Sequence, residues 1–174
     1  MTTALSSREP DVPALRNHPT LTVRPAHPGD AAALVALSRP FVDSGALRER
    51  PLSLYADRAA DFLVAEGPGG TLDGCLGLRA HPADPTAGLA ATGVLYNFCV
   101  AGHRQGCGTG ARLLRAALAK ARGRSLRTLF TATTGGGDLF LRHGFAPARA
   151  SQAPPSWARS LDPRRNARIL ARAL

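Results

Sequence analysis

The sequence is poor in aromatic residues, in cysteine and in long apolar runs, and each shortage excludes a class of protein. Six Phe, two Tyr and one Trp among 174 residues leave few rings on which bases could stack, which argues against single-stranded nucleic acid as a partner. Three cysteines without a CxxC pair favour neither a disulfide framework nor a metal site, and they indicate a reducing compartment. No apolar run approaches the ~18 residues of a membrane-spanning helix.

Basic residues are abundant and are almost all of one kind. Arginine accounts for all but Lys120 of the 22 basic residues, which outnumber 12 acidic residues and give a formal net charge of +10. Such a balance favours an anionic partner: nucleic acid, a membrane surface or a phosphorylated small molecule. The arginines are spread along the chain, apart from a cluster near its C-terminus. We therefore expect a small-molecule partner and no membrane, and keep a basic nucleic-acid-associated protein as an alternative.

The length and the 44% hydrophobic content predict one domain that buries a core of its own. Residues 1–19 lack the apolar segment of a signal peptide and contain Glu9 and Asp11, so we expect a disordered leader. Residues 20–174 then form the single domain, which ends in an Arg-rich segment. Together with the cysteine usage, this organisation predicts a cytoplasmic protein.

Hydrophobic periodicity predicts strands that alternate with helices. Pro40 should end the first helix, and the almost continuously apolar segment 94–100 is typical of a central strand buried on both faces. The order of elements predicts an α/β or α+β fold in which helices cover a mixed sheet, followed by an Ala/Pro-rich tail. The expected strands are 21–24, 61–66, 74–78, 94–100, 127–131 and 145–148, and the expected helices are 31–37, 52–59, 110–122 and 137–141.

A glycine-rich loop, Gln-Gly-Cys-Gly-Thr-Gly at residues 105–110, joins the central strand to an amphipathic helix. Glycines leave backbone N–H groups uncovered, and a helix N-terminus adds about half a positive charge, so the loop can hold a phosphate. The absence of GxxxxGK[ST] excludes a P-loop. Gly106-x-Gly108-x-x-Ala111 fits a relaxed dinucleotide fingerprint, but the acidic residue expected ~20 positions later is missing. Dinucleotide binding is therefore the weaker alternative.

The same six residues match the phosphate motif Q/R-x-x-G-x-G/A of the GNAT acetyltransferases, and the chain resembles this superfamily from about residue 22 to 148. The resemblance implies a mixed, mostly antiparallel sheet flanked by helices, with a splayed central strand. It also implies acetyl-CoA as co-substrate and no bound metal, and it is compatible with a homodimer. The implied coenzyme contacts are Phe98, Val100, Gln105, Gly106, Cys107, Gly108, Thr109, Gly110, Ala111 and Phe140.

Shorter segments are similar to the acetyltransferase domain of the N-acetylglutamate synthases. They include residues 44–47, residues 143–145 and the segment 164–170, which is similar to that family's closing motif Q-R-R-S-K-V-L. None of these 174 residues resembles the amino-acid-kinase domain of the longer synthases, so we expect the short, stand-alone form. It implies acetyl transfer to the α-amine of glutamate or a related amino acid, as in arginine biosynthesis.

An acidic amino acid needs cations to hold its carboxylates, and arginine binds a carboxylate in a bidentate manner. The synthase resemblance assigns this role to Arg50 and Arg165, with Tyr96 as a further acceptor contact. Ala167 stands where the family has a serine. This change keeps open a detoxifying acetyltransferase that acts on an amino-acid analogue or an antibiotic.

The catalytic groups implied by the superfamily are partly missing. Val94 stands where many members have a glutamate base, and Phe140 stands where many have a tyrosine acid. Backbone N–H groups near Cys99 can still polarise the thioester carbonyl, and Asn97 can act on a water. A nucleophilic Cys99 is less favoured because no Cys-His-Asp/Asn set accompanies it. The missing groups leave a CoA-binding sensor with little catalysis as an alternative.

Overall fold

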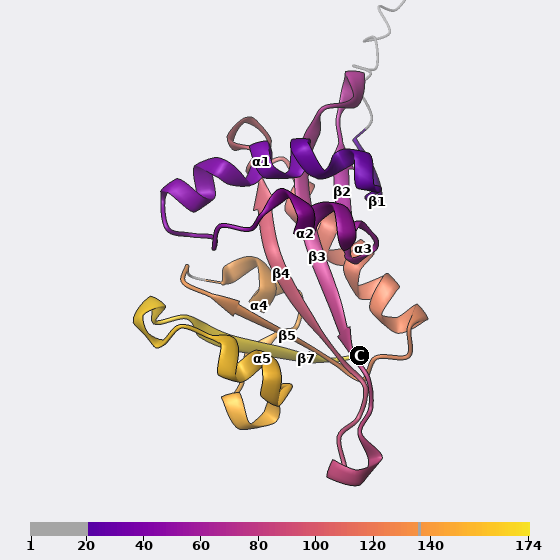
Figure 1. Cartoon of the computed structure of the whole chain (residues 1–174), viewed down its shortest axis with the longest axis vertical. Coiled ribbons are helices and arrows are strands. Elements are labelled where there is room, and N and C mark those ends of the chain that lie inside the picture. Colours follow the sequence, from indigo (N-terminus) through magenta and orange to yellow (C-terminus); the bar gives the residue numbers. More distant parts are fainter. Residues whose placement is uncertain (1–20, 136) are drawn as a thin grey trace, which may run out of the picture.

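The computed structural model describes residues 21–135 and 137–174, and it contains one sheet of seven strands (Figure 1). The strand order is β1-β2-β3-β4-β5-β7-β6. Among the described pairs, β4 and β5 run parallel and the others run antiparallel, which confirms the mixed, mostly antiparallel sheet. The strands are β1 (Thr22–Pro25), β2 (Phe62–Glu66), β3 (Leu72–His81), β4 (Thr92–Val100), β5 (Thr128–Thr133), β6 (Ala146–Pro147) and β7 (Arg168–Ala173).

The helices cover both faces of the sheet because the strands alternate their side chains. On β2, Leu63 and Ala65 pack into one core with Leu114 of α3, whereas Phe62 and Val64 pack into a second core under α1 and α2. No helix in the described ranges is both long and apolar enough to cross a membrane. The helices are α1 (Ala31–Asp43), α2 (Leu52–Asp57), α3 (Thr109–Gly123), α4 (Asp138–Arg142) and α5 (Pro155–Ser160).

Helix α5 packs on the same face of the sheet as α1 and α2, at the other end of the sheet. Val94, Phe130 and Ala153 form a small core against which Trp157 of α5 packs, and the rings of Phe130 and Trp157 lie 6.3 Å apart. Figure 1 shows α1 and α2 over the β1–β4 half and α5 over β5 and β7. Two separate groups of helices therefore cover this face.

The central strand separates from its parallel neighbour partway along its length. Pairing of β4 with β5 runs from Thr92↔Thr128 to Leu95↔Thr131 and no further in the described residues, while β5 continues to pair with β7. β4 also contains a bulge, because Tyr96 pairs with Gly77 but Cys99 pairs with Cys75. A bulge bends and twists a strand. The splayed central strand that the superfamily resemblance implied is thus present.

Two expectations about local structure are wrong. Helix α1 continues through Pro40 to Asp43, because Phe41 packs against the core under α1 and α2 and offsets the hydrogen bond lost at the proline. The tail is not free of elements: α5 and β7 follow, and β7 lies between β5 and β6. The expected leader, residues 1–19, lies outside the described residues.

The fully buried Leu170 of β7 joins the core beneath α3, so the tail contributes to stability. Leu170→Ala should lower the free energy of unfolding by about 2–5 kcal/mol, through lost burial and the remaining cavity. Urea denaturation followed by circular dichroism measures this loss. The exposed Arg164→Ala is the control and should change stability by less than about 0.5 kcal/mol. A Leu170→Ala loss as small as the control's would contradict the placement of β7 in the core.

Candidate active site

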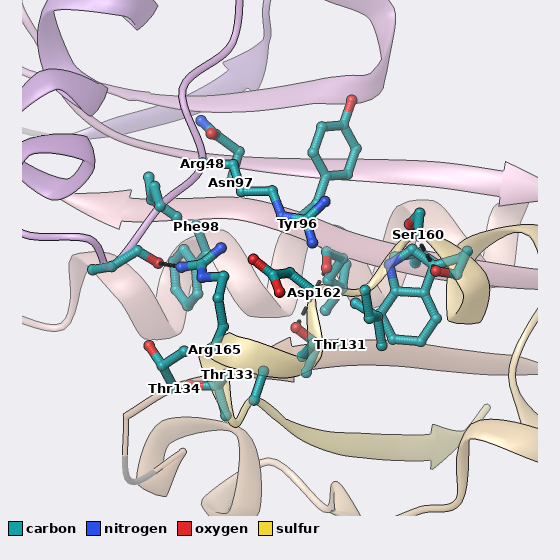
Figure 2. A pocket seen from close by; sticks show the side chains of 18 of the residues that line it. Arg48, Tyr96, Asn97, Phe98, Thr131, Thr133, Thr134, Ser160, Asp162 and Arg165 are labelled. Atoms are coloured by element: carbon teal, nitrogen blue, oxygen red, sulfur yellow. Dashed lines mark hydrogen bonds between the residues drawn. The ribbon is translucent and has the colours of Figure 1, made fainter.

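A cavity of about 650 Å³ opens where β4 and β5 separate (Figure 2). Its walls are residues 94–98 of β4, residues 131–135 at the end of β5, the loop between α1 and α2, and the segment from α5 to residue 167. The two groups of helices that cover this face therefore both contribute to the cavity. Residues 96–98 of β4 line it beyond the last described pair with β5, and a strand edge without a partner offers backbone N–H and C=O groups to a ligand.

Uncovered amide groups lie beyond the end of β4, at the start of α3. The N–H groups of Gly106, Gly108, Thr109, Gly110 and Ala111 donate to no oxygen of the residues that the structure describes. Gly106 and Gly108 have φ values of +75° and +80°, which favour glycine. A Cβ at either position would meet no atom within 4 Å. The loop therefore presents donors at a helix N-terminus, an arrangement suited to a phosphate.

The neighbouring coenzyme-contact candidates lie at the same end of β4. The Gln105 side chain donates to the Val100 carbonyl at 3.0 Å, which ties the loop to the strand. Phe98 packs edge-on against Phe140, with ring centroids 5.6 Å apart. Exposed Cys107 has an amide 3.4 Å from the Arg104 carbonyl, so this amide is less available than its neighbours. The fold gathers the predicted residues from three separate elements.

The bulge in β4 is held by a buried polar cluster. Asn97 has a φ of +50°, and its side-chain amide donates to the Ser38 hydroxyl at 3.1 Å. The Tyr55 hydroxyl donates to the Ser38 hydroxyl at 3.1 Å and to the side-chain Oδ1 of Asn97 at 3.3 Å. These contacts tie the bulge to α1 and α2. The Asn97 side chain therefore positions the strand at the point where it separates from β5.

Two arginines stack on the ring of Tyr96 at the cavity wall. The guanidinium carbons of Arg50 and Arg79 lie 5.1 Å and 5.2 Å from the ring centroid, within the range of cation–π contacts. Gly77 makes room for the ring, since a Cβ there would lie 2.7 Å from it. Arg79 also lies 3.9 Å from Asp61. Burial lowers the pKa of Arg50, so a bound anion would offset a real desolvation cost.

Both tyrosines have raised pKa values. Burial, followed by the charge of Asp61, raises the pKa of Tyr96 to about 12, and its hydroxyl donates to Asp61 at 3.3 Å. Burial also raises the pKa of Tyr55. A phenol with such a pKa stays protonated near neutral pH, so Tyr96 does not serve as the proton acceptor there. Its ring instead supports the two arginines.

Arg165 reaches the cavity from the tail. Its guanidinium donates to the carbonyls of Gly45 and Ala46 at 2.8 Å and 2.7 Å, so it joins the tail to the loop between α1 and α2. Arg50 and Arg165 come from segments far apart in sequence, yet both line the cavity with Arg48 and Arg79. The lining is strongly cationic and suits a ligand with carboxylates.

The side chain of the candidate residue Cys99, on β4, points away from the cavity. Its thiol is buried and lies 3.5 Å from the Cys75 thiol on the neighbouring strand, and its side chain does not line the cavity. The hydrogen bond between the thiols lowers the pKa of Cys99, and the same contact, together with burial, raises the pKa of Cys75. The thiol thus faces Cys75 and not the cavity, and a nucleophilic role of Cys99 stays a hypothesis, whereas its backbone lies near the open strand edge.

Arg79, Asp162 and Trp157 also line the cavity, and sequence reasoning had missed them. The two-residue spacing of Gly77 and Arg79 could have placed both on one strand face, but only the structure shows that Tyr96 packs there. Asp162 and Trp157 come from the tail, whose elements were not predicted. Within the described residues no group of His, Cys, Asp and Glu side chains has the geometry of a metal site.

Comparison with known proteins gives consistent matches. The family model described as Acetyltransferase (GNAT) domain matches residues 58–147. The amino-acid acetyltransferase of Neisseria meningitidis serogroup B (strain ATCC BAA-335 / MC58) is 32% identical over 157 residues, covering 88% of this chain and 34% of the relative. That of Ralstonia nicotianae (strain ATCC BAA-1114 / GMI1000) is 30% identical over 152 residues, covering 87% of this chain and 32% of the relative. The chain therefore spans about a third of the length of the curated relatives it matches.

Solved structures agree with these matches. N-acetylglutamate synthase from Neisseria gonorrhoeae, complexed with coenzyme A and N-acetyl-glutamate, superposes with a TM-score of 0.79 at 30% identity, over 89% of this chain and 35% of that one. A Mycobacterium tuberculosis protein in complex with CoA and NLQ superposes with a TM-score of 0.71 at 23% identity, over 88% of this chain and 99% of that one. The second match supports the fold alone.

The raised pKa values allow the burial of the tyrosines to be tested by titration, because the chain contains only two. In the folded protein Tyr96 should stay protonated at pH 10, and Tyr55 should titrate above its unfolded value, whereas both should titrate near pH ~10 in urea. A raised folded-state pKa contributes stability that is complete below pH ~10 and is lost as the pH rises toward 12. Absorbance at 295 nm and urea denaturation measure the two effects. Tyr96→Phe isolates the signal of Tyr55, and a native transition centred at pH 10 would contradict the burial of both hydroxyls.

Proposed function

Because this chain belongs to the GNAT acetyltransferase family, we propose that it transfers the acetyl group of acetyl-CoA to the α-amine of glutamate or a glutamate-like amino acid. The observation that carries the proposal is the open edge of β4. It links a loop of uncovered amides at one end to an arginine-lined cavity at its side. The relatives named amino-acid acetyltransferase support the same substrate class.

The residues present fit acetyl-CoA at the end of β4. The free amides of Gly106 and of the first turn of α3 would hold the diphosphate, and Gln105 would keep the loop in place. The pantetheine arm would extend the sheet by pairing with the edge of β4 that β5 leaves open, beside Phe98 and Val100. This path directs the thioester toward the cavity.

Acetyl transfer then needs the amine in its neutral form beside the thioester carbon. A backbone N–H near Cys99 would donate to the carbonyl oxygen as negative charge develops there. The amine nitrogen forms the C–N bond, the C–S bond breaks, and the thiolate leaves with the bonding electron pair. Of the two protons that the ammonium loses, one goes to water and one to the thiolate. Phe140 offers no acid, and a thiolate is a good enough leaving group to depart without one.

The acceptor would bind with its carboxylates against the arginines. Arg50 and Arg79 share the Tyr96 platform, so they present two guanidinium groups to one region of the cavity. Arg165 supplies a third from the opposite wall, while it holds the loop through Gly45 and Ala46. Three cations suit an acceptor with two carboxylates better than a simple amine. Glutamate has this distribution of charge.

The phosphate-binding role of the loop is tested by a matched pair at Gly108. Asp and Asn both tolerate its left-handed backbone, so Gly108→Asp and Gly108→Asn differ mainly in charge. A carboxylate beside the diphosphate should weaken acetyl-CoA binding by about 1–3 kcal/mol relative to the amide. Isothermal titration calorimetry measures the difference. Acetylated pantetheine, which lacks the diphosphate, should bind both variants equally, and equal acetyl-CoA affinities would contradict the role.

Thiol release from acetyl-CoA with glutamate as acceptor tests the activity, and Arg50→Ala tests the carboxylate contact. Loss of a bidentate guanidinium should raise the KM for glutamate by about tenfold or more, with the KM for acetyl-CoA almost unchanged. Arg58→Ala is the control, because Arg58 is exposed and does not line the cavity. Equal increases in both KM values would reject Arg50 as an acceptor ligand. Absence of turnover with every amino acid would reject the proposed activity.

A further inference from the structure

One carboxylate lies among the arginines of the cavity. Asp162 is the only Asp or Glu among the described lining residues, and Arg48, Arg50, Arg79 and Arg165 line the same space. Asp162 comes from the tail, just before the short turn Pro163–Arg165. The cavity therefore has a cationic wall and a single anionic point.

The Asp162 side chain has a fixed direction. One carboxylate oxygen accepts a hydrogen bond from the backbone N–H of Arg164 at 3.0 Å, which is the geometry of an N-cap. Figure 2 shows the carboxylate pointing from the tail toward the space between Arg165 and Tyr96. The cap uses one oxygen and leaves the other available to a ligand.

Within the part of the chain that the structure describes, this carboxylate has no counter-ion. No Lys, Arg or His among residues 21–135 and 137–174 forms an ion pair with Asp162, although four arginines share its cavity. The arginines attract carboxylates and repel an ammonium group. For an amino acid in this cavity, the favourable position of the nitrogen is therefore beside Asp162.

We propose that Asp162 binds the ammonium group of the amino-acid acceptor while the arginines hold its carboxylates. This inference rests on the proposed function and deepens it, because it assigns the residue that selects an α-amino acid over a dicarboxylate without nitrogen. A carboxylate accepts hydrogen bonds from an ammonium and from a neutral amine alike. The contact therefore persists when the nitrogen loses its proton, and it keeps the nitrogen oriented for attack.

Asp162→Asn is the decisive variant, because the amide keeps the cap to Arg164 and removes the charge. The KM for glutamate should rise by about tenfold or more, as expected for the loss of a charge-assisted contact, and the KM for acetyl-CoA should stay within about twofold. Glutarate has the same two carboxylates and no nitrogen. Its inhibition constant against glutamate should therefore be unchanged or lower in Asp162→Asn. Asp57→Asn, exposed and outside the cavity lining, is the control.

The outcomes separate the two proposals. An unchanged KM for glutamate in Asp162→Asn, or a parallel weakening of glutarate, would overturn the ammonium contact; the second result would indicate a general distortion of the cavity. A wild-type protein that acetylates no amino acid would overturn the proposed function itself. Calorimetric titration of wild type and Asp162→Asn with glutamate and glutarate would then still decide whether Asp162 discriminates by charge.

Discussion

The site depends on the separation of β4 from β5, which share no described ladder pair beyond Leu95↔Thr131. Paired strands satisfy each other's backbone groups and leave nothing for a ligand. Separation of these two strands opens a backbone edge in the middle of the sheet. The bulge at Asn97 directs β4 away from β5, and the contacts of Asn97 with Ser38 and Tyr55 hold it. Polar residues in the core thus maintain the opening.

Positive charge is concentrated at this opening, and its burial costs free energy. Burial lowers the pKa of Arg50, which means that its charged form is less well solvated than in water. The Tyr96 ring compensates in part through cation–π contacts, and Gly77 makes the space for that ring. A carboxylate ligand would complete the compensation. The same electrostatics that suit an anionic acceptor also explain why an ammonium group needs the separate carboxylate of Asp162.

The tail belongs to both the fold and the site. β7 inserts between β5 and β6 and buries Leu170 in the core. Its position fixes the preceding turn, from which Arg165 reaches the carbonyls of Gly45 and Ala46. One segment therefore completes the sheet, anchors a loop of the opposite half and supplies two charged side chains to the cavity. Because these contacts span more than a hundred residues of sequence, their formation requires the whole domain to fold.

The sequence by itself determined what is local. Spacing predicts the Gly106–Gly108 loop before an amphipathic helix and the apolar strand of Phe98, because these features depend on neighbours a few residues away. The family motifs indicate the arginines at positions 50 and 165. Only the tertiary structure decided which residues meet across distance. It turned the Cys99 thiol toward Cys75, stacked Arg79 on Tyr96 and brought Asp162 opposite the arginines, because strand order and the bulge set these contacts. No local periodicity predicts that β7 pairs between β5 and β6.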